Sequence, residues 1–198
     1  MSALAHAELV RALRAGGSAG EAPLLTDLRR QLTRAAKRAR RDPFGAAATY
    51  DDFDAAPHTF GLVAEAALYR RLTGDHRFDA FATAQRDWAL GANAWGASLM
   101  IGVGRDYPRC PQHVVANLNG SATRLLVGAV VNGPNDRTLF ADGLGEFFDE
   151  GRTCPRGRDR YVKFTGHGSR YVDDVRSWQT VEPAIDFTAA AALAFALS

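Results

Sequence analysis

The stretch from Tyr171 to Ala189, YVDDVRSWQTVEPAIDFTA, changes character at its middle. Its first part combines aromatic and acidic side chains, and its second part continues as an almost wholly apolar segment that ends at Leu197. A helix that is apolar on every side is typical of burial among other helices. The sequence therefore predicts that a polar loop meets a buried helix, spanning about residues 182–197, at Glu182.

Two interpretations of Glu182 follow from this position. As a structural residue, it precedes Pro183 at the start of a helix, where the helix dipole favours a carboxylate. As a functional residue, it is a partly desolvated acid whose pKa is raised towards neutrality, as a proton donor to a glycosidic oxygen requires. Aromatic rings beside carboxylates also suit a carbohydrate site, since rings stack on sugars and carboxylates bind hydroxyl groups. The residues alone leave both interpretations open.

Upstream, to about residue 90, helical periods alternate with short breaks. Three helices are expected, over about residues 25–39, 57–72 and 78–90. Their apolar faces are Leu25, Leu28, Leu32, Ala35, Ala36 and Ala39; Phe60, Ala64, Ala67, Leu68 and Leu72; and Phe78, Phe81, Ala82, Gln85, Trp88 and Ala89. Such short connections favour antiparallel neighbours. This half is predicted to be a stack of helical hairpins.

The middle, residues 91–170, is rich in Gly, Pro, Asn and Asp, and only residues 125–131 suggest buried regular structure. A loop region of this length inside a compact domain is usually functional or disordered. Interleaved aromatic residues argue against disorder, because they can be buried. These residues are Trp95, Tyr107, Phe140, Phe147, Phe148, Tyr161 and Phe164.

Composition excludes several classes of protein. The 198 residues are 46% apolar and 23% charged, as in ordinary globular domains. No run of eighteen apolar residues is present, so no membrane span is predicted, and Met1–Val10 does not have the pattern of a secretory signal. The net charge of +2 is too small to indicate a nucleic-acid partner by itself.

Two further features have ordinary interpretations. A basic helix face lacks interleaved aromatic residues and is interpreted as a solvated surface, with nucleic-acid binding as the alternative. That face comprises Arg29, Arg30, Arg34, Lys37, Arg38, Arg40 and Arg41. Cys110, His113 and Cys154 lack the fourth ligand of a zinc site, and we predict no metal. A Cys110–Cys154 disulfide and two free thiols both remain open.

The stretch Tyr171-x-Asp173-x(4)-Trp178-x(3)-Glu182-x-Ala184-x(3)-Thr188-Ala189 resembles the C-terminal signature of glycoside hydrolase family 9, a family of cellulases with an (α/α)6 barrel. Only the signature's Asn differs, replaced by Thr188. Residues 87–96 and 126–135 are similar to other blocks of the family in the same order. The resemblance implies an all-α fold, in which residues 1–198 form the C-terminal portion of a six-hairpin glycosidase domain with long active-site loops.

The resemblance also implies roles for individual residues. Glu182 is the general acid, and Asp173 is the active-site aspartate that orients and tunes the site. The family's His-x-Arg block falls at Gln112-His113-Val114, so either His113 replaces the histidine from a neighbouring position or Gln112 and Asn117 recognise the sugar. For three aromatic residues, sugar stacking and core packing are both open: Trp178, Tyr171 and Trp95.

One catalytic element of the family is missing. Family members invert the anomeric centre and need a second carboxylate to activate water. In the family that base lies in an Asp-Ala-Gly-Asp motif, which does not occur here. We therefore expect the acid-bearing part of a β-1,4-glucanase site, inactive as an isolated chain, with a non-catalytic carbohydrate-binding remnant as the alternative.

The expected partner is a β-glucan or cello-oligosaccharide, with no cofactor, nucleic acid or membrane. An incomplete barrel should expose apolar helix faces and self-associate. The family implies an extracellular location, although no signal peptide is recognised in residues 1–198.

Overall fold

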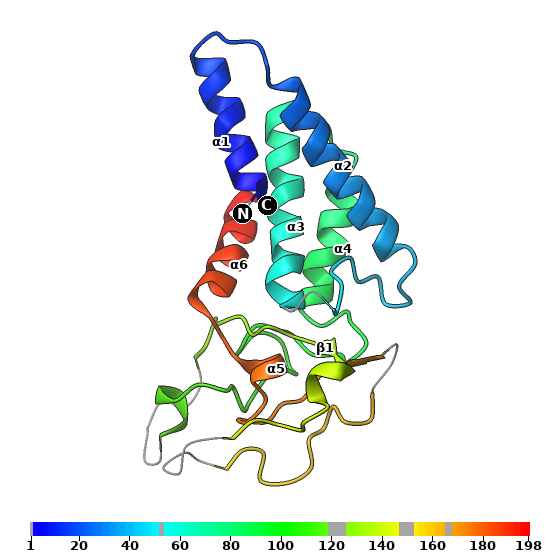
Figure 1. Cartoon of the computed structure of the whole chain (residues 1–198), viewed down its shortest axis with the longest axis vertical. Coiled ribbons are helices and arrows are strands. Elements are labelled where there is room, and N and C mark those ends of the chain that lie inside the picture. The colour runs from blue at the N-terminus through cyan, green and yellow to red at the C-terminus, as the bar shows by residue number, and fades with distance from the viewer. Residues whose placement is uncertain (1, 52–53, 119–125, 147–152, 165–167) are drawn as a thin grey trace.

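The computed structural model describes residues 2–51, 54–118, 126–146, 153–164 and 168–198. Its long helices form a helical layer in the upper half of Figure 1, and the described residues between 91 and 184 form a loop layer below them. The long helices are α1 (Ser2–Ala15), α2 (Ala22–Ala39), α3 (Ala55–Thr73), α4 (Asp79–Ala89) and α6 (Ile185–Leu197). The predicted all-α fold with long loops is confirmed.

Helix α3 is the centre of the helical layer. It contacts α1, α2, α4 and α6, and its side chains are buried on almost every side. Gly74 ends the helix with φ of 71°, a left-handed conformation that glycine adopts without strain, and its N–H bonds to the Arg70 carbonyl. The predicted helix over residues 57–72 is confirmed.

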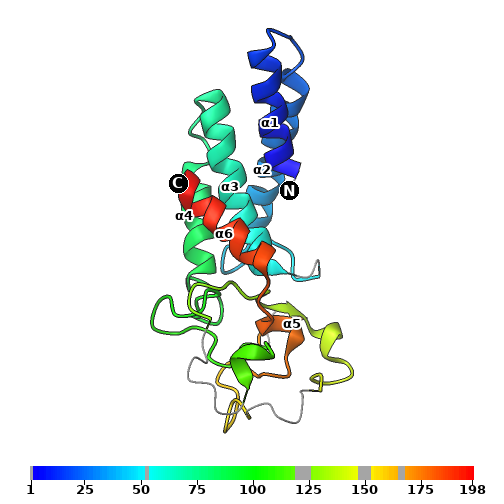
Figure 2. The ribbon, with the colours of Figure 1, turned by 90° about the vertical axis from the view of Figure 1, so that its left-hand side faces the viewer.

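The other predicted helices are also present, and one further long helix, α1, was not predicted. Leu28, Leu32 and Ala35 are the buried stripe of α2, and Gln85, Trp88 and Ala89 are buried on α4. Helix α1 is the one that was not predicted, although its Ala7 and Val10 side chains, three positions apart, are fully buried. It packs against α2 and α3 beside them (Figure 2). The basic residues of α2 are exposed, as a solvated surface requires.

The expectation that the last helix is buried on all sides is wrong for this chain. Helix α6 buries Ala191, Ala194 and Leu197 against α3, while Ile185 is 92% exposed. Ala189, Ala192 and Ala196 continue the exposed side at helical spacing. We call these four residues, from Ile185 to Ala196, the outer stripe of α6. All four side chains of the stripe are apolar, and no described residue covers them.

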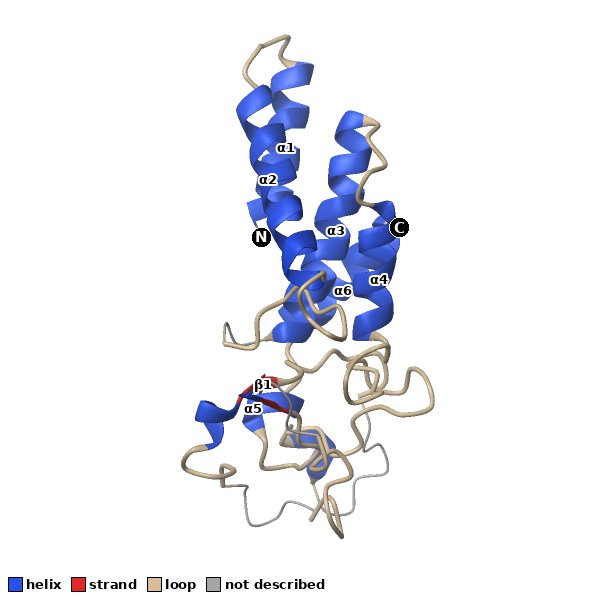
Figure 3. Ribbon diagram, turned by 90° about the vertical axis from the view of Figure 1, so that its right-hand side faces the viewer, coloured by secondary structure: helices blue, strands red, loops and turns tan. Residues whose placement is uncertain are grey.

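The loop layer contains only short regular elements. These are η1 (Val115–Asn117), β1 (Asn135–Asp136), η2 (Arg137–Phe140), β2 (Ser169–Arg170) and α5 (Trp178–Val181). Strands β1 and β2, drawn in red in Figure 3, pair antiparallel. In this pairing Asn135 lies opposite Arg170.

Over the described residues 126–131 of the segment predicted as regular structure, 125–131, no helix or β-ladder is found. Leu125 lies outside the described residues, as do Phe147 and Phe148. Val130 and Val131 are fully buried but make only isolated bridges, to Met100 and Pro183. In these loops, buried asparagine side chains form hydrogen bonds with backbone groups that a β-ladder would otherwise pair. No described helix is long and apolar enough to cross a membrane.

Candidate functional site

Glu182 lies at the end of α5, where the loop layer meets α6. Its side chain is exposed. The interpretation of Glu182 as a proton donor expected a partly buried carboxyl, and the described residues do not bury it. Its main chain is fixed instead. The Glu182 carbonyl accepts a hydrogen bond from the Asn132 N–H at 3.1 Å, and the preceding Val181 carbonyl accepts one from the Gln112 N–H at 2.9 Å. Two loops distant in sequence therefore determine where Glu182 is presented.

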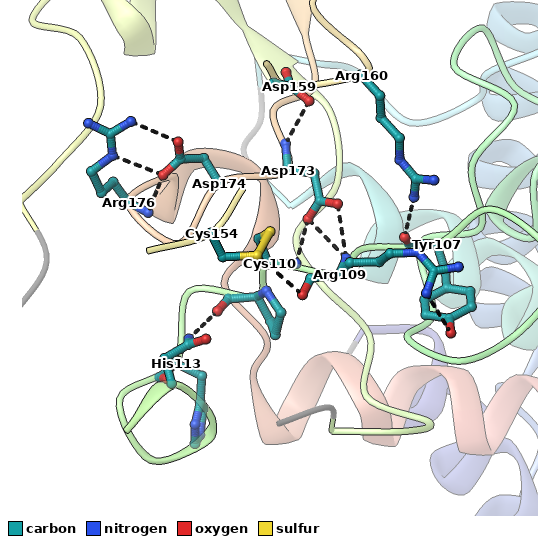
Figure 4. Close-up of a disulfide and its surroundings, with 12 residues drawn as sticks. Tyr107, Arg109, Cys110, His113, Cys154, Asp159, Arg160, Asp173, Asp174 and Arg176 are labelled. Atoms are coloured by element: carbon teal, nitrogen blue, oxygen red, sulfur yellow. Dashed lines mark hydrogen bonds and ion pairs between the residues drawn. A yellow bond between two sulfur atoms is a disulfide. The ribbon is translucent and has the colours of Figure 1, made fainter. Parts of the chain in front are cut away.

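Asp173 is buried behind this segment. Its carboxylate accepts hydrogen bonds from the Arg109 N–H at 2.9 and 3.0 Å and from the Cys110 N–H at 2.8 Å (Figure 4). Burial raises the pKa of the Asp173 carboxyl, and the two backbone N–H donors oppose that rise. Asp159 accepts a longer bond, 3.4 Å, from the Asp173 N–H. Asp173 is thus occupied in holding a loop.

The neighbouring Asp174 is also occupied. Its carboxylate makes a two-point ion pair with the Arg176 guanidinium, at 2.9 and 2.8 Å, and also accepts from the Arg176 N–H. Asp174 raises the pKa of Arg176 through this hydrogen bond. Neither Asp173 nor Asp174 is therefore an uncommitted carboxylate in the described structure.

The loop that follows Cys110 contains His113, which was predicted to contact substrate. His113 Nδ1 accepts a hydrogen bond from the Ala116 N–H at 3.2 Å and so caps η1. Asn117, the alternative sugar ligand, is fully buried, and its amide donates to the carbonyls of Pro111 and His113 at 2.5 and 2.8 Å. The expectation that Asn117 recognises sugar is not supported, because its amide organises this loop. Gln112 and His113 are half-buried at its surface.

The three aromatic candidates separate clearly. Tyr171 is 1% exposed and packs on Tyr161, with ring centroids 4.9 Å apart. Trp95 donates from Nε1 to the Phe164 carbonyl at 3.1 Å and packs edge-on against Tyr171. The contacts of Tyr171 and Trp95 therefore favour core packing over sugar stacking. Trp178 is 38% exposed and is the ring of the three most accessible to a ligand.

Cys110 and Cys154 form a disulfide, which decides between the two alternatives left open. Both sulfur atoms are therefore unavailable as thiolate ligands. Among the residues that the structure describes, no group of three or more His, Cys, Asp or Glu side chains could hold a metal ion.

Asp54 was not predicted as part of this region. It precedes α3 with φ of 58°, and burial together with the negative charges of Asp186 and Glu182 raises its pKa to about 6. The Ala56 N–H, in the first turn of α3, bonds to the Asn132 carbonyl at 2.9 Å, so this helix end lies beside the Glu182 segment. The acidic run Tyr50–Asp54 in the sequence was its only signal.

Comparison with known proteins identifies the family of the chain. The family model described as "Glycosyl hydrolase family 9" matches residues 30–195. The chain belongs to glycosyl hydrolase family 9.

Relatives with known sequences and structures show how much of the domain is present. Endoglucanase 21 of Oryza sativa subsp. japonica is 34% identical over 97 residues, which cover 38% of this chain and 18% of the relative. GH family 9 endoglucanase J30 aligns with a TM-score of 0.64 at 24% identity, covering 88% of this chain and 30% of that structure.

AaCel9A in complex with cellobiose-like isofagomine aligns with a TM-score of 0.67 at 21% identity, covering 97% of this chain and 34% of that structure. The described fold is therefore part of an (α/α)6 barrel. The chain spans about a third of the solved family structures and less than a fifth of the curated relatives.

Proposed function

We propose that this chain carries the proton-donating part of a β-1,4-glucanase site, with Glu182 as the general acid. The single observation that supports it best is the presentation of Glu182. The carboxylate at the signature's acid position is exposed at the end of α5, four residues from the exposed ring of Trp178, on a main chain held by two loops. Family membership and the sugar-like ligand of AaCel9A support the substrate class.

The roles follow from the chemistry of inverting hydrolysis. A carboxylic acid protonates the leaving oxygen while a second carboxylate activates water on the opposite face of the sugar. Glu182 would supply the proton, and the Trp178 ring would stack on a glucose unit. Asp173 and Asp174 are committed to a backbone anchor and an ion pair, so neither supplies the base. The described chain alone is therefore expected to hydrolyse little or nothing.

Chemical rescue tests the assignment of the acid. Azide is a nucleophile that needs no base, so with cellopentaose it should give slow formation of a glycosyl azide by the wild-type chain. Glu182→Gln should abolish this product, because an unactivated sugar leaving group still needs a proton. Equal product from Glu182→Gln, or rapid cleavage of a soluble β-glucan without azide, would contradict the proposal.

A second candidate function is carbohydrate binding without catalysis. It is favoured by the same commitment of Asp173 and Asp174, which leaves the exposed ring of Trp178 and the exposed carboxylate of Glu182 without a second carboxylate assigned to activate water. Calorimetric titration with cellopentaose should then show binding that survives Glu182→Gln and is lost in Trp178→Ala. Phe195→Ala on α6, whose ring is comparably exposed at 41%, is the matched control. Binding without any azide product would favour this second function, and no binding at all would reject both.

A further inference from the structure

The Cys110–Cys154 disulfide joins two loops to the same segment of the signature. The Cys110 N–H donates to Asp173 Oδ1 at 2.8 Å, and the Cys154 carbonyl accepts from the Val175 N–H at 3.0 Å. The two cysteines are 44 residues apart in sequence, with Cα atoms separated by 5.4 Å. Figure 4 shows the cross-link beside the Asp173 carboxylate. Both halves of the disulfide are therefore bonded to residues 173–175.

The same network continues to the main chain of Glu182. Two residues after Cys110, the Gln112 N–H donates to the Val181 carbonyl at 2.9 Å. The Thr180 hydroxyl donates to the Val172 carbonyl at 2.7 Å and accepts from the Val172 N–H at 3.2 Å. These bonds close a ring from Cys110 through Asp173, Val172, Thr180 and Val181 back to Gln112. We call this ring, with its disulfide, the Cys110 clamp.

The clamp depends on a buried charge. When ionised, the Asp173 carboxylate is compensated by the N–H groups of Arg109 and Cys110, and a buried carboxylate without such donors is costly. The loop that supplies these donors and the loop that carries Cys154 cannot move far apart, because the disulfide joins them. Loss of the cross-link would therefore leave the 109–112 backbone, and through Gln112 the Val181 carbonyl, held by hydrogen bonds alone.

We propose that the Cys110 clamp positions Glu182, with Asp173 and the disulfide as positioning residues, and that this positioning depends on the redox state of the disulfide. The part of the test that measures carbohydrate binding rests on the proposed function above. Reduction by one dithiothreitol transfers two electrons and two protons, which breaks the S–S bond, gives two thiols and leaves the reagent as a cyclic disulfide. No group is transferred to the protein.

Hydrogen exchange of the full chain tests the clamp without any sugar. On reduction, the amides of Arg109, Cys110, Gln112 and Val175 should exchange at least about tenfold faster, since their acceptors are no longer held in place. Amides at the centre of α3, such as Val63 and Leu68, should keep their protection. Unchanged exchange at residues 109–112 would overturn the proposal. Equal loss of protection in α3 would also overturn it, because the disulfide would then hold the whole fold.

A second variant keeps the disulfide intact. Asp173→Asn replaces one acceptor oxygen by an NH2 group and should expose the amides of Arg109 and Cys110 to exchange. Asp136→Asn is the matched control, because Asp136 caps η2 in the same loop layer through the Thr138 N–H and has no bond to the clamp. If Asp136→Asn has the same effect as Asp173→Asn, the role assigned to the clamp is wrong.

Cellopentaose titration completes the experiment. The dissociation constant should rise about tenfold on reduction and in Asp173→Asn, and should stay unchanged in Asp136→Asn. If exchange changes as expected but the oxidised chain binds no cellopentaose, the clamp stands and the proposed function fails. If the oxidised chain forms the glycosyl azide product and reduction alters neither exchange nor affinity, the proposed function stands and the clamp is rejected.

Discussion

Asn132 joins the start of α3 to the segment that presents Glu182. Its N–H donates to the Glu182 carbonyl at 3.1 Å, and its own carbonyl accepts from the Ala56 N–H at 2.9 Å. Its side chain adds a third link, because the amide donates to the Trp178 carbonyl at 2.6 Å. One fully buried residue therefore connects the helical layer with both ends of α5.

Replacement of Asn132 should destabilise the protein. Asn132→Ala removes the buried bond to the Trp178 carbonyl and should lower the free energy of unfolding by about 1–3 kcal/mol. Asn132→Asp should cost more, because a carboxylate would face that carbonyl oxygen. Urea denaturation measures both. Asp142→Ala, at an exposed position of the loop layer, is the control that should leave stability unchanged.

Gln85 fixes the loop between α2 and α3 to helix α4. Its Oε1 accepts from the Ala47 N–H at 3.0 Å, and its Nε2 donates to the Gly45 carbonyl at 2.9 Å. Gln85→Leu keeps the volume but leaves both backbone groups unsatisfied, so unfolding should be easier by about 2–3 kcal/mol. The exposed Thr83→Ala on the same helix should change stability by less than about 0.5 kcal/mol. Equal stability of the two variants in urea would refute this role for Gln85.

Glu65 should make stability depend on pH. It is buried in α3, and burial, with the charge of Asp27, raises its pKa to about 7. A carboxyl with a raised folded-state pKa contributes stability that is complete below its unfolded value, about 4.5, and is lost as the pH rises through 7. Glu65→Gln should therefore be more stable than the wild type at pH 8, by about 3 kcal/mol.

Thermal denaturation between pH 4 and pH 8 measures this difference. The wild-type stability should fall over that range relative to Glu65→Gln. Glu8→Gln, an exposed change on α1, should follow the wild type. A constant difference between Glu65→Gln and wild type across the range would show that Glu65 does not titrate with folding.

Asp54 should respond to removal of the charge of Glu182. The negative charges of Asp186 and Glu182 contribute to raising the Asp54 pKa to about 6, after burial. Glu182→Gln and Asp186→Asn should each lower that pKa, because each removes one repulsive charge. Carbon-detected NMR titration of the Asp54 carboxyl measures the shift. Glu146→Gln, at an exposed position, should have no effect, and an unchanged Asp54 pKa in both test variants would separate this residue from the site.

The outer stripe of α6 should promote self-association. Its apolar residues are exposed at helical spacing, and burying one large aliphatic side chain yields about 1.5–3 kcal/mol. Sedimentation velocity should show species larger than a monomer that grow with concentration, and Ile185→Asp should shift them to monomer. Val162→Asp changes an equally apolar exposed residue of the loop layer and should not. Identical behaviour of both variants would mean that another surface mediates association.

Several features could be predicted from the sequence because they depend on local chemistry. The periods of α2, α3 and α4 follow from the spacing of residues such as Leu28 and Leu32, and a glycine at position 74 ends α3. The signature from Tyr171 to Ala189 indicated the family, since its residue types and spacings are specific. The exposed or buried state of these residues did not follow from the pattern.

Tertiary structure alone decided how the signature is used. Asp173 and Glu182 are nine positions apart in the sequence, yet one is buried against the backbone of residues 109–110 and the other is exposed beside Asn132. Those contacts join segments distant along the chain, and loops without periodicity carry no local signal of their partners. The same long-range packing decides three further features. It pairs Cys110 with Cys154, it buries Asn117 and Tyr171, and it brings the negative charge of Glu182 close enough to raise the pKa of Asp54.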